Sequence, residues 1–217
     1  GFRGYEGGPE SESARADGDR RIGGLIYVDR EEPTGTNRRN VQSPGQLKAL
    51  SAQLQSYAST PLRIAIDQEG GQVSRLKEQY GFPKTVSAAY QGRENDPTKT
   101  LEWAGRTART LSTAGINVDF APCVDVNVNP KCPVIGARER SFSADPETVT
   151  LHARQWVKAL AEQGIVSALK HFPGHGSSRT DSHLGLTDIT ATWQEATELA
   201  PYEHFIRSGY QTQGMIM

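Results

Sequence analysis

Short apolar runs recur along the chain and are separated by longer segments whose apolar positions have helical spacing. Each run is bounded by polar residues, glycine or proline, which predicts a buried strand. The runs cover residues 22–28, 61–66, 116–122, 164–169 and 214–217. Because they lack regular alternation of apolar and polar side chains, we expect the strands to be covered on both faces.

The segments between these runs predict amphipathic helices, since their apolar side chains recur every three or four residues. Ser43 and Pro44 open the first helix, because serine caps a helix and proline fits its first turn. Asp145 begins another, and Gly115 and Gly164 fit helix ends. Further helices are predicted over residues 97–114 and 190–208, and a short one within 76–91.

Strand and helix alternate along the chain, which predicts parallel strands joined by crossover helices. Polar residues follow each strand, which favours a (β/α) barrel over an open sheet. No Gly-x-Gly-x-x-Gly motif follows a strand, so the dinucleotide-binding signature is missing. Only five or six strands are predicted, whereas a complete barrel has eight. We therefore expect an α/β fold, a (β/α)8 TIM-type barrel in one domain over residues 1–217, with its C-terminal part missing.

The composition limits the kinds of molecule that this protein is expected to bind. The 217 residues include 24 basic and 25 acidic side chains, a net charge of −1, which predicts neither a nucleic-acid surface nor a polybasic membrane patch. No apolar run is long enough for a membrane span. The first residue is Gly1, so a targeting segment could have been removed and the compartment stays open. Cys123 and Cys132 are interpreted as reduced thiols, with a disulfide as the alternative.

Polar side chains concentrate directly after the run at residues 164–169. Lys170 and His171 come first, and His175, Asp181 and His183 follow within a stretch rich in glycine. Proline and glycine in this stretch exclude a regular helix, so the first two histidines do not share a helix face.

Two other polar clusters, residues 67–75 and 125–140, also follow strands. A barrel would bring all three clusters to one mouth, where they suit a small ligand with many hydroxyls, such as a sugar. Asp67, Lys170 and His171 directly follow apolar strands, where a charged group is costly unless it faces a polar cavity. Ligand contact is therefore favoured over a structural ion pair. Arg75 and Arg140 are weaker candidates alone, and Glu69 is either catalytic or a residue that holds its loop.

Asp181 and His183 form an Asp-x-His pair in which the carboxylate can orient the imidazole. Such a histidine can serve as general acid and then as general base. The alternative is a solvated polar loop. A zinc site formed by His171, His175, Asp181 and His183 is disfavoured, because the spacing matches no zinc signature and Lys170 would repel a cation. No metal and no cofactor are expected.

Four motifs carry a resemblance to a known family. Lys-His-Phe-Pro-Gly-His-Gly at 170–176 with Asp-Ser-His at 181–183, Asp-Gln-Glu-Gly-Gly-Gln-Val-Ser-Arg at 67–75, residues 117–127, and residues 133–136 with 140–143 stand in the family's order. The sequence resembles glycoside hydrolase family 3, in its bacterial β-N-acetylglucosaminidase branch. Gln72 stands where the family usually has arginine.

The resemblance implies a TIM barrel and a retaining mechanism with an aspartate nucleophile and a covalent glycosyl-enzyme. It implies that His183 is the acid/base catalyst and Asp181 its partner. The substrate would be a small carbohydrate, terminal β-linked N-acetylglucosamine on peptidoglycan fragments or chitooligosaccharides. The residues implied to bind that sugar are Asp67, Arg75, Arg140, Lys170 and His171.

The resemblance also places the nucleophile on a strand after residues 215–217, so we expect no turnover by the sequence as given and turnover by the full-length protein. Two alternatives stay open: a phosphorylase with the same site, and a non-catalytic sugar-binding remnant. The resemblance leaves the compartment undecided, because Gram-negative recycling enzymes of this kind are cytoplasmic and other relatives are exported.

Overall fold

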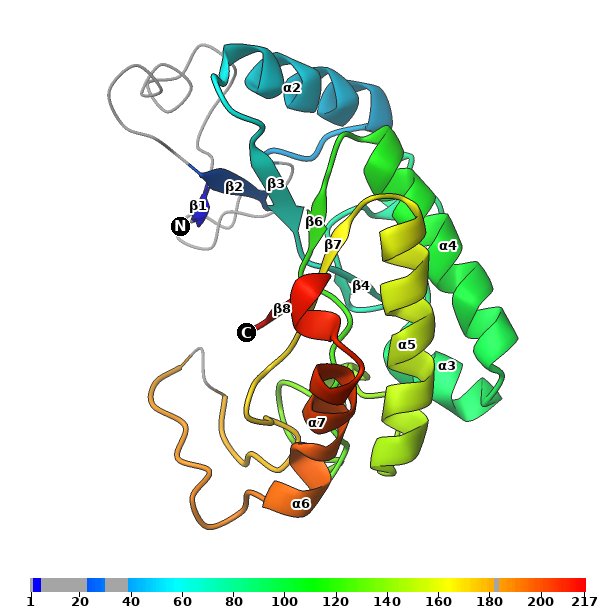
Figure 1. The fold of residues 1–217 in the computed structure, drawn as a ribbon, viewed down its shortest axis with the longest axis vertical. Helices are drawn as coiled ribbons and strands as arrows, with labels where there is room; N and C mark the ends of the chain where they lie inside the picture. Colours follow the sequence, from blue (N-terminus) through cyan, green and yellow to red (C-terminus); the bar gives the residue numbers. More distant parts are fainter. Residues whose placement is uncertain (1, 5–22, 30–38, 182–183) are drawn as a thin grey trace.

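Six parallel strands form the main sheet of the computed structural model, which describes residues 2–4, 23–29, 39–181 and 184–217 (Figure 1). Their order in the sheet is their order in the sequence. The strands are β1 (Phe2–Gly4), β2 (Gly24–Tyr27), β3 (Arg63–Ile66), β6 (Val118–Asp119), β7 (Val166–Leu169) and β8 (Met215–Ile216). Sequential parallel strands joined by helices confirm the predicted α/β fold and form part of a TIM-type barrel wall.

The predicted strands are found, with differences in extent. The apolar run at residues 116–122 contributes only Val118–Asp119 as a regular strand, because the chain then pairs through single hydrogen bonds, such as Phe120 N to Ile66 O at 2.8 Å. The first strand, Phe2–Gly4, was not predicted, since it lies outside any apolar run. The polar residues after β3 form an antiparallel hairpin of β4 (Gln68–Gly70) and β5 (Val73–Ser74).

The long helices begin as the sequence predicts. They are α2 (Pro44–Tyr57), α4 (Pro97–Thr113) and α5 (Pro146–Glu162). Each has proline in its first turn and a capping side chain before it: Ser43 accepts from Gln46 N, and Asp96 and Asp145 each accept from two backbone N–H groups. The shorter α3 (Ala88–Glu94) is capped by Ser87. All three long helices lie on one side of the sheet (Figure 1).

The prediction of a single helix over residues 190–208 is wrong. The chain forms turns up to Gln194 and then two short helices, α6 (Glu195–Glu198) and α7 (Ala200–Arg207). Pro201 explains the break, since proline has no N–H to donate and its ring clashes with the carbonyl four residues earlier. Among the described residues, no helix has the length and apolar character needed to cross a membrane.

Two apolar clusters lie on opposite faces of the sheet. The larger joins Ile64 and Ile66 to the helices, including Leu47 of α2 and Trp156 of α5. The smaller contains Ala65, Val118, Phe120 and Ala168 with Ile26, Val166 and Met215 packed against it. Since neighbouring side chains of a strand point to opposite faces, the smaller cluster lies on the face away from the helices, which is the interior of the barrel wall.

Candidate functional site

A buried lysine connects the carboxyl ends of two strands. Lys170 directly follows β7, and its side chain is only 3% exposed. Its Nζ lies 2.7 Å from Asp67 Oδ1, just after β3, and 2.7 Å from Glu69 Oε1 in β4. The ammonium therefore joins two carboxylates, one just before the hairpin of β4 and β5 and one within it, and these use two of its three donors.

Arg140 binds the same Glu69 through two hydrogen bonds. Its Nε and Nη2 atoms lie 2.9 and 2.7 Å from the two carboxylate oxygens. Its Nη1 donates to Val134 O at 2.9 Å, and Nη2 also lies 2.9 Å from His171 Nε2. The guanidinium is thus fixed on every side, and it brings the loop at residues 123–143 against the end of β7.

Charge pairing dominates the protonation states of these groups. Burial alone would raise the pKa of Glu69, but the charges of Lys170 and Arg140 and their hydrogen bonds hold it at about 2. Burial alone would lower the pKa of Lys170, but Glu69 and Asp67 raise it above the ordinary value. At neutral pH the network therefore contains ionised carboxylates and protonated cations that compensate one another.

His171 is held between a carboxylate and a cation. Its Nδ1 lies 2.6 Å from Asp125 Oδ2, and the carboxylate also accepts from the backbone N–H groups of His171 and His175 at 3.2 and 2.7 Å. Burial alone would raise the pKa of Asp125, but bonding to His171 lowers it to about 2. Arginine cannot accept, so His171 Nε2 accepts from Arg140 and the ring proton lies on Nδ1. The hydrogen bonds thus assign a neutral imidazole with both nitrogen atoms engaged.

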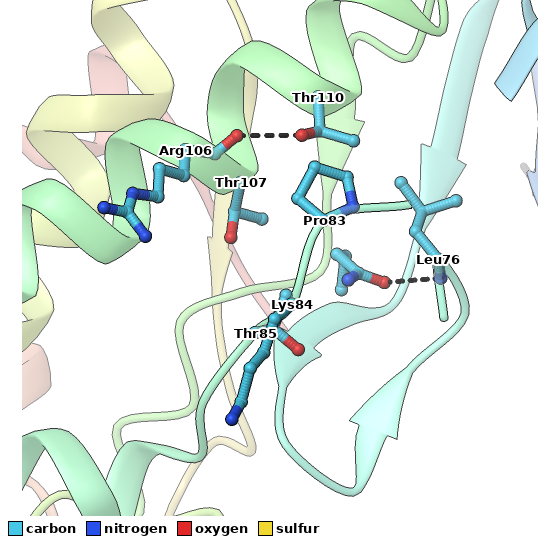
Figure 2. A pocket seen from close by; sticks show the side chains of 8 residues that line it. Leu76, Pro83, Lys84, Thr85, Arg106, Thr107 and Thr110 are labelled. Carbon is cyan, nitrogen blue, oxygen red and sulfur yellow. Dashed lines mark hydrogen bonds between the residues drawn. The ribbon is translucent and has the colours of Figure 1, made fainter. Parts of the chain in front are cut away.

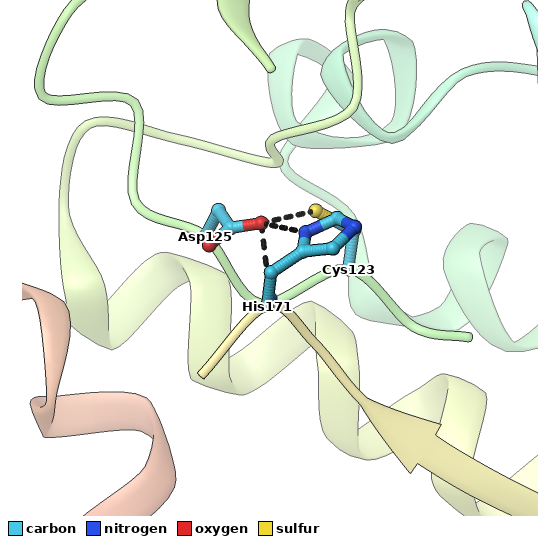
Figure 3. A group of neighbouring side chains, drawn as sticks. All are labelled: Cys123, Asp125 and His171. Carbon is cyan, nitrogen blue, oxygen red and sulfur yellow. Dashed lines mark hydrogen bonds and ion pairs between the residues drawn. The ribbon is translucent and has the colours of Figure 1, made fainter. Parts of the chain in front are cut away.

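Three side chains of this cluster are metal-ligand types: Cys123, Asp125 and His171 (Figure 3). Their ligand atoms bond to one another, since Cys123 Sγ donates to Asp125 Oδ2 at 3.1 Å and His171 Nδ1 binds the same oxygen. Burial raises the pKa of the Cys123 thiol well above its ordinary value, which keeps it protonated. With Arg140 beside them, these groups suit a hydrogen-bonded cluster better than a cation site. Cys123 and Cys132 are both buried free thiols.

A second ion-pair group lies at the ends of β2 and β3. Arg75 lies 3.8 Å from Asp67 Oδ2 and 3.7 Å from Asp29 Oδ1, and Lys77 also pairs with Asp29. Asp29 is buried and follows β2. Asp67 is therefore bounded by Lys170 on one side and by Arg75 on the other.

The network places all five residues predicted to bind a sugar in one connected group. Three of them reach solvent: Asp67, His171 and Arg75 have side chains 24, 30 and 32% exposed. Lys170 and Arg140 lie beneath them. Asp181 is half-buried in the following loop, where its carbonyl accepts from Leu184 N at 3.1 Å. His183 lies outside the described residues.

The sequence did not predict the central positions of Asp125 and Glu69 in this network. Glu69 has a local signal, since it follows a strand only two residues after Asp67. Asp125 has none that relates it to His171, because that contact joins residues far apart in the chain.

Asp119 was also missed. It is fully buried at the end of β6, and burial raises its pKa well above the ordinary value. Its Oδ1 accepts from Gln68 N at 3.0 Å, so this buried carboxyl group supports the hairpin that carries Glu69.

A small cavity lies between the hairpin of β4 and β5 and helix α4 (Figure 2). Its volume is about 10 Å³, room for roughly one water molecule. The lining residues are Gln68, Leu76, Pro83, Lys84, Thr85, Arg106, Thr107 and Thr110. It is too small for a sugar.

Known proteins similar to this chain share one activity class in their names. Beta-hexosaminidase A of Pseudoalteromonas piscicida is 41% identical over 189 residues, which is 82% of this chain and 31% of that protein. Beta-hexosaminidase of Neisseria meningitidis serogroup C, strain FAM18, is 37% identical over 200 residues, 88% of this chain and 52% of that protein. The chain therefore spans about a third of the length of the first of these curated relatives and about half of the length of the second.

Solved structures share the fold. A family 3 β-N-acetylglucosaminidase from Paenibacillus sp. FPU-7 superposes with a TM-score of 0.84 at 35% identity, covering 96% of this chain and 38% of that one. NagZ from Neisseria gonorrhoeae, in complex with N-trifluoroacetyl-D-glucosamine, gives 0.83 at 32% identity, covering 100% and 62%. The family model of the glycosyl hydrolase family 3 N-terminal domain matches residues 9–217. The chain therefore belongs to glycosyl hydrolase family 3.

Proposed function

We propose that the full-length protein is a retaining glycoside hydrolase that removes terminal β-linked N-acetylglucosamine from peptidoglycan fragments or chitooligosaccharides. One observation carries the proposal: Asp67, Arg75 and His171 face solvent from a rigid, charge-compensated network at the strand ends. The names of the relatives support the same activity, since they are beta-hexosaminidases and a β-N-acetylglucosaminidase.

The network suits a sugar because its outer groups present fixed acceptors and donors. The Asp67 carboxylate can accept from sugar hydroxyls, and Arg75 can donate to sugar oxygens. The Lys170 ammonium has three N–H donors. Asp67 and Glu69 accept from two of them, and the third is left for a sugar oxygen. Because these groups already hold one another in place, little side-chain entropy is lost when a sugar binds.

The proton-transfer role falls to a different histidine from His171. Both ring nitrogens of His171 are already engaged, since Nδ1 binds Asp125 and Nε2 accepts from Arg140. We propose instead that His183, paired with Asp181, donates a proton to the leaving oxygen and then takes one from the attacking water. An aspartate nucleophile, which the family resemblance places after Met217, would attack the anomeric carbon in the first step and leave it in the second.

The test uses the full-length protein, with an aryl N-acetyl-β-glucosaminide and a chitooligosaccharide as substrates. His183→Ala should lower the rate on the order of 100-fold for the oligosaccharide. The loss should be smaller for the aryl substrate, whose leaving group needs less acid assistance. His204→Ala, on the exposed face of α7, is the matched control and should keep the wild-type rate. Unchanged rates for His183→Ala would exclude the acid/base assignment.

Product analysis separates hydrolysis from transfer to phosphate. In phosphate buffer, release of free N-acetylglucosamine supports the proposal, whereas a sugar 1-phosphate would establish a phosphorylase. Binding of N-acetylglucosamine without turnover of either substrate would establish a sugar-binding protein.

A further inference from the structure

One buried carboxylate holds both ends of the loop that contains Asp181. Glu198, in α6, has no exposed surface. Its Oε1 accepts from Ser177 N at 3.1 Å, and its Oε2 accepts from Gln194 N at 3.0 Å. Residues 178–181 and 184–193 are the described part of the segment between these two anchor points, so a single side chain fixes the distance between Ser177 and Gln194.

Capping of α6 accounts for only one of these bonds. Gln194 is the residue before the first turn of α6, and its N–H is a local partner for Glu198. The bond from Ser177 crosses between segments and is not needed by the helix. Gly174, with φ +129°, also packs on Glu198, because a Cβ there would lie 2.6 Å from Glu198 Cβ. The turn after His171 is thus shaped around this side chain.

Further hydrogen bonds hold the start and the end of the Asp181 loop. Asn129 Nδ2 donates to Ser178 O at 2.8 Å, and Asn129 N donates to Gly176 O at 2.9 Å. Trp193 Nε1 donates to Pro173 O at 3.2 Å, which again joins the end of the loop to its beginning. The base of the loop is therefore connected to the turn that starts at Lys170 and His171.

We propose that Glu198 is a positioning residue that sets the placement of the Asp181 loop relative to the sugar network. The inference rests on the function proposed above, in which Asp181 belongs to the acid/base pair. Glutamine at position 198 can accept at only one oxygen, so it keeps one anchor and loses the other. Alanine loses both. Neither change touches Asp67, Arg75 or Arg140, so sugar binding should persist.

The decisive measurement is the dependence of the loss on the leaving group. In the full-length protein, Glu198→Ala should lower kcat for a chitooligosaccharide on the order of 10-fold or more, the range seen when supporting partners of a functional group are removed. The loss should be clearly smaller for an activated aryl substrate, and the dissociation constant for N-acetylglucosamine should stay within about twofold of the wild-type value. Glu198→Gln should fall between wild type and alanine. Equal losses on both substrates would overturn the inference.

A double-mutant cycle distinguishes this inference from the proposed function. If Glu198 acts through the loop, Glu198→Ala should add little to the loss already caused by Asp181→Asn. Full additivity would overturn the positioning role, whereas no effect of Asp181→Asn alone would instead contradict the proposed acid/base pair. Trp193→Phe removes the indole N–H that donates to Pro173 O and keeps a smaller aromatic ring, so it tests the same connection if the Glu198 variants misfold. This variant should also lose more kcat on the chitooligosaccharide than on the aryl substrate, by a smaller factor than Glu198→Ala. Equal losses on the two substrates in a folded Trp193→Phe protein would count against the proposal.

Discussion

Arg140 and Glu69 form a bidentate ion pair, with N–O distances of 2.9 and 2.7 Å, although they come from different loops of the barrel. Lys170 lies 2.7 Å from one of the same carboxylate oxygens. Glu69 is therefore the shared counterion of two buried cations, and it joins the ends of β3 and β7 to the long loop after β6.

Replacing Glu69 by glutamine should destabilise the protein strongly. The change leaves two buried cations without their shared charge, and loss of one partner from a buried pair typically costs about 3–5 kcal/mol. Urea unfolding of wild type and Glu69→Gln measures the difference. Glu162→Gln is the matched control: its carboxylate is exposed and lies 4.0 Å from Lys158, so its cost should stay below about 0.5 kcal/mol. Equal costs for the two variants would contradict the central role of Glu69.

Stability should fall steeply in acid because Glu69 and Asp125 have lowered pKa values. Both are held at about 2, against ordinary values of 4.5 and 3.8. A lowered pKa stabilises the folded state fully above the ordinary value, and that contribution is lost as pH falls toward the folded value. The free energy of unfolding should therefore decrease between about pH 4.5 and pH 2. The decrease should be shallower in Glu69→Gln, and the same slope in both proteins would contradict the assignment.

Two buried aspartates near the site should respond differently to replacement by asparagine, because burial raises the pKa of Asp119 whereas bonding to His171 lowers that of Asp125. Asp125 accepts from four groups, namely Cys123 Sγ, His171 N, His171 Nδ1 and His175 N, and it is ionised. Asp125→Asn should cost at least about 2 kcal/mol, since hydrogen bonds to charged groups are worth roughly 1.5–3 kcal/mol each. It should also weaken binding of N-acetylglucosamine by displacing His171.

Asp119→Asn should change stability by less than about 1 kcal/mol at low pH, because a protonated, neutral acid is then replaced by a neutral amide of similar shape. Its pKa is raised by burial, so its contribution to stability is present at low pH and is lost as pH rises through the raised value. The variant should therefore gain stability relative to wild type as pH increases. Thermal unfolding across pH 4 to 9 measures this, and a uniform loss at every pH would show that Asp119 is ionised.

The sequence predicted the fold better than the contacts of the site. Apolar runs mark the strands, and Ser43 and Asp145 mark helix starts, because burial and capping are local properties. Lys170 and Asp67 were recognised because each directly follows a strand. The pairing of Asp125 with His171 and the anchoring of Ser177 by Glu198 depend on how distant loops meet at the barrel mouth. No local pattern encodes those distances, and Pro201 was an available signal for the helix break that was overlooked.

Gly176→Ala should be far more disruptive than Gly45→Ala. A Cβ at Gly176 would lie 1.7 Å from Val126 O, so the turn must move away from the backbone that carries Asp125. That movement breaks the bond between Asn129 N and Gly176 O, and overpacking of this kind typically costs about 1–3 kcal/mol.

At Gly45, in the first turn of α2, a Cβ meets nothing within 4 Å. Alanine there should stabilise the protein by up to about 1 kcal/mol through its higher helix propensity. Thermal unfolding checks both variants, and titration with N-acetylglucosamine shows whether the site is affected. Only Gly176→Ala should weaken that binding, because a Cβ there displaces the backbone beside Asp125, which holds His171. Normal affinity in Gly176→Ala would show that the position of His171 does not depend on this turn.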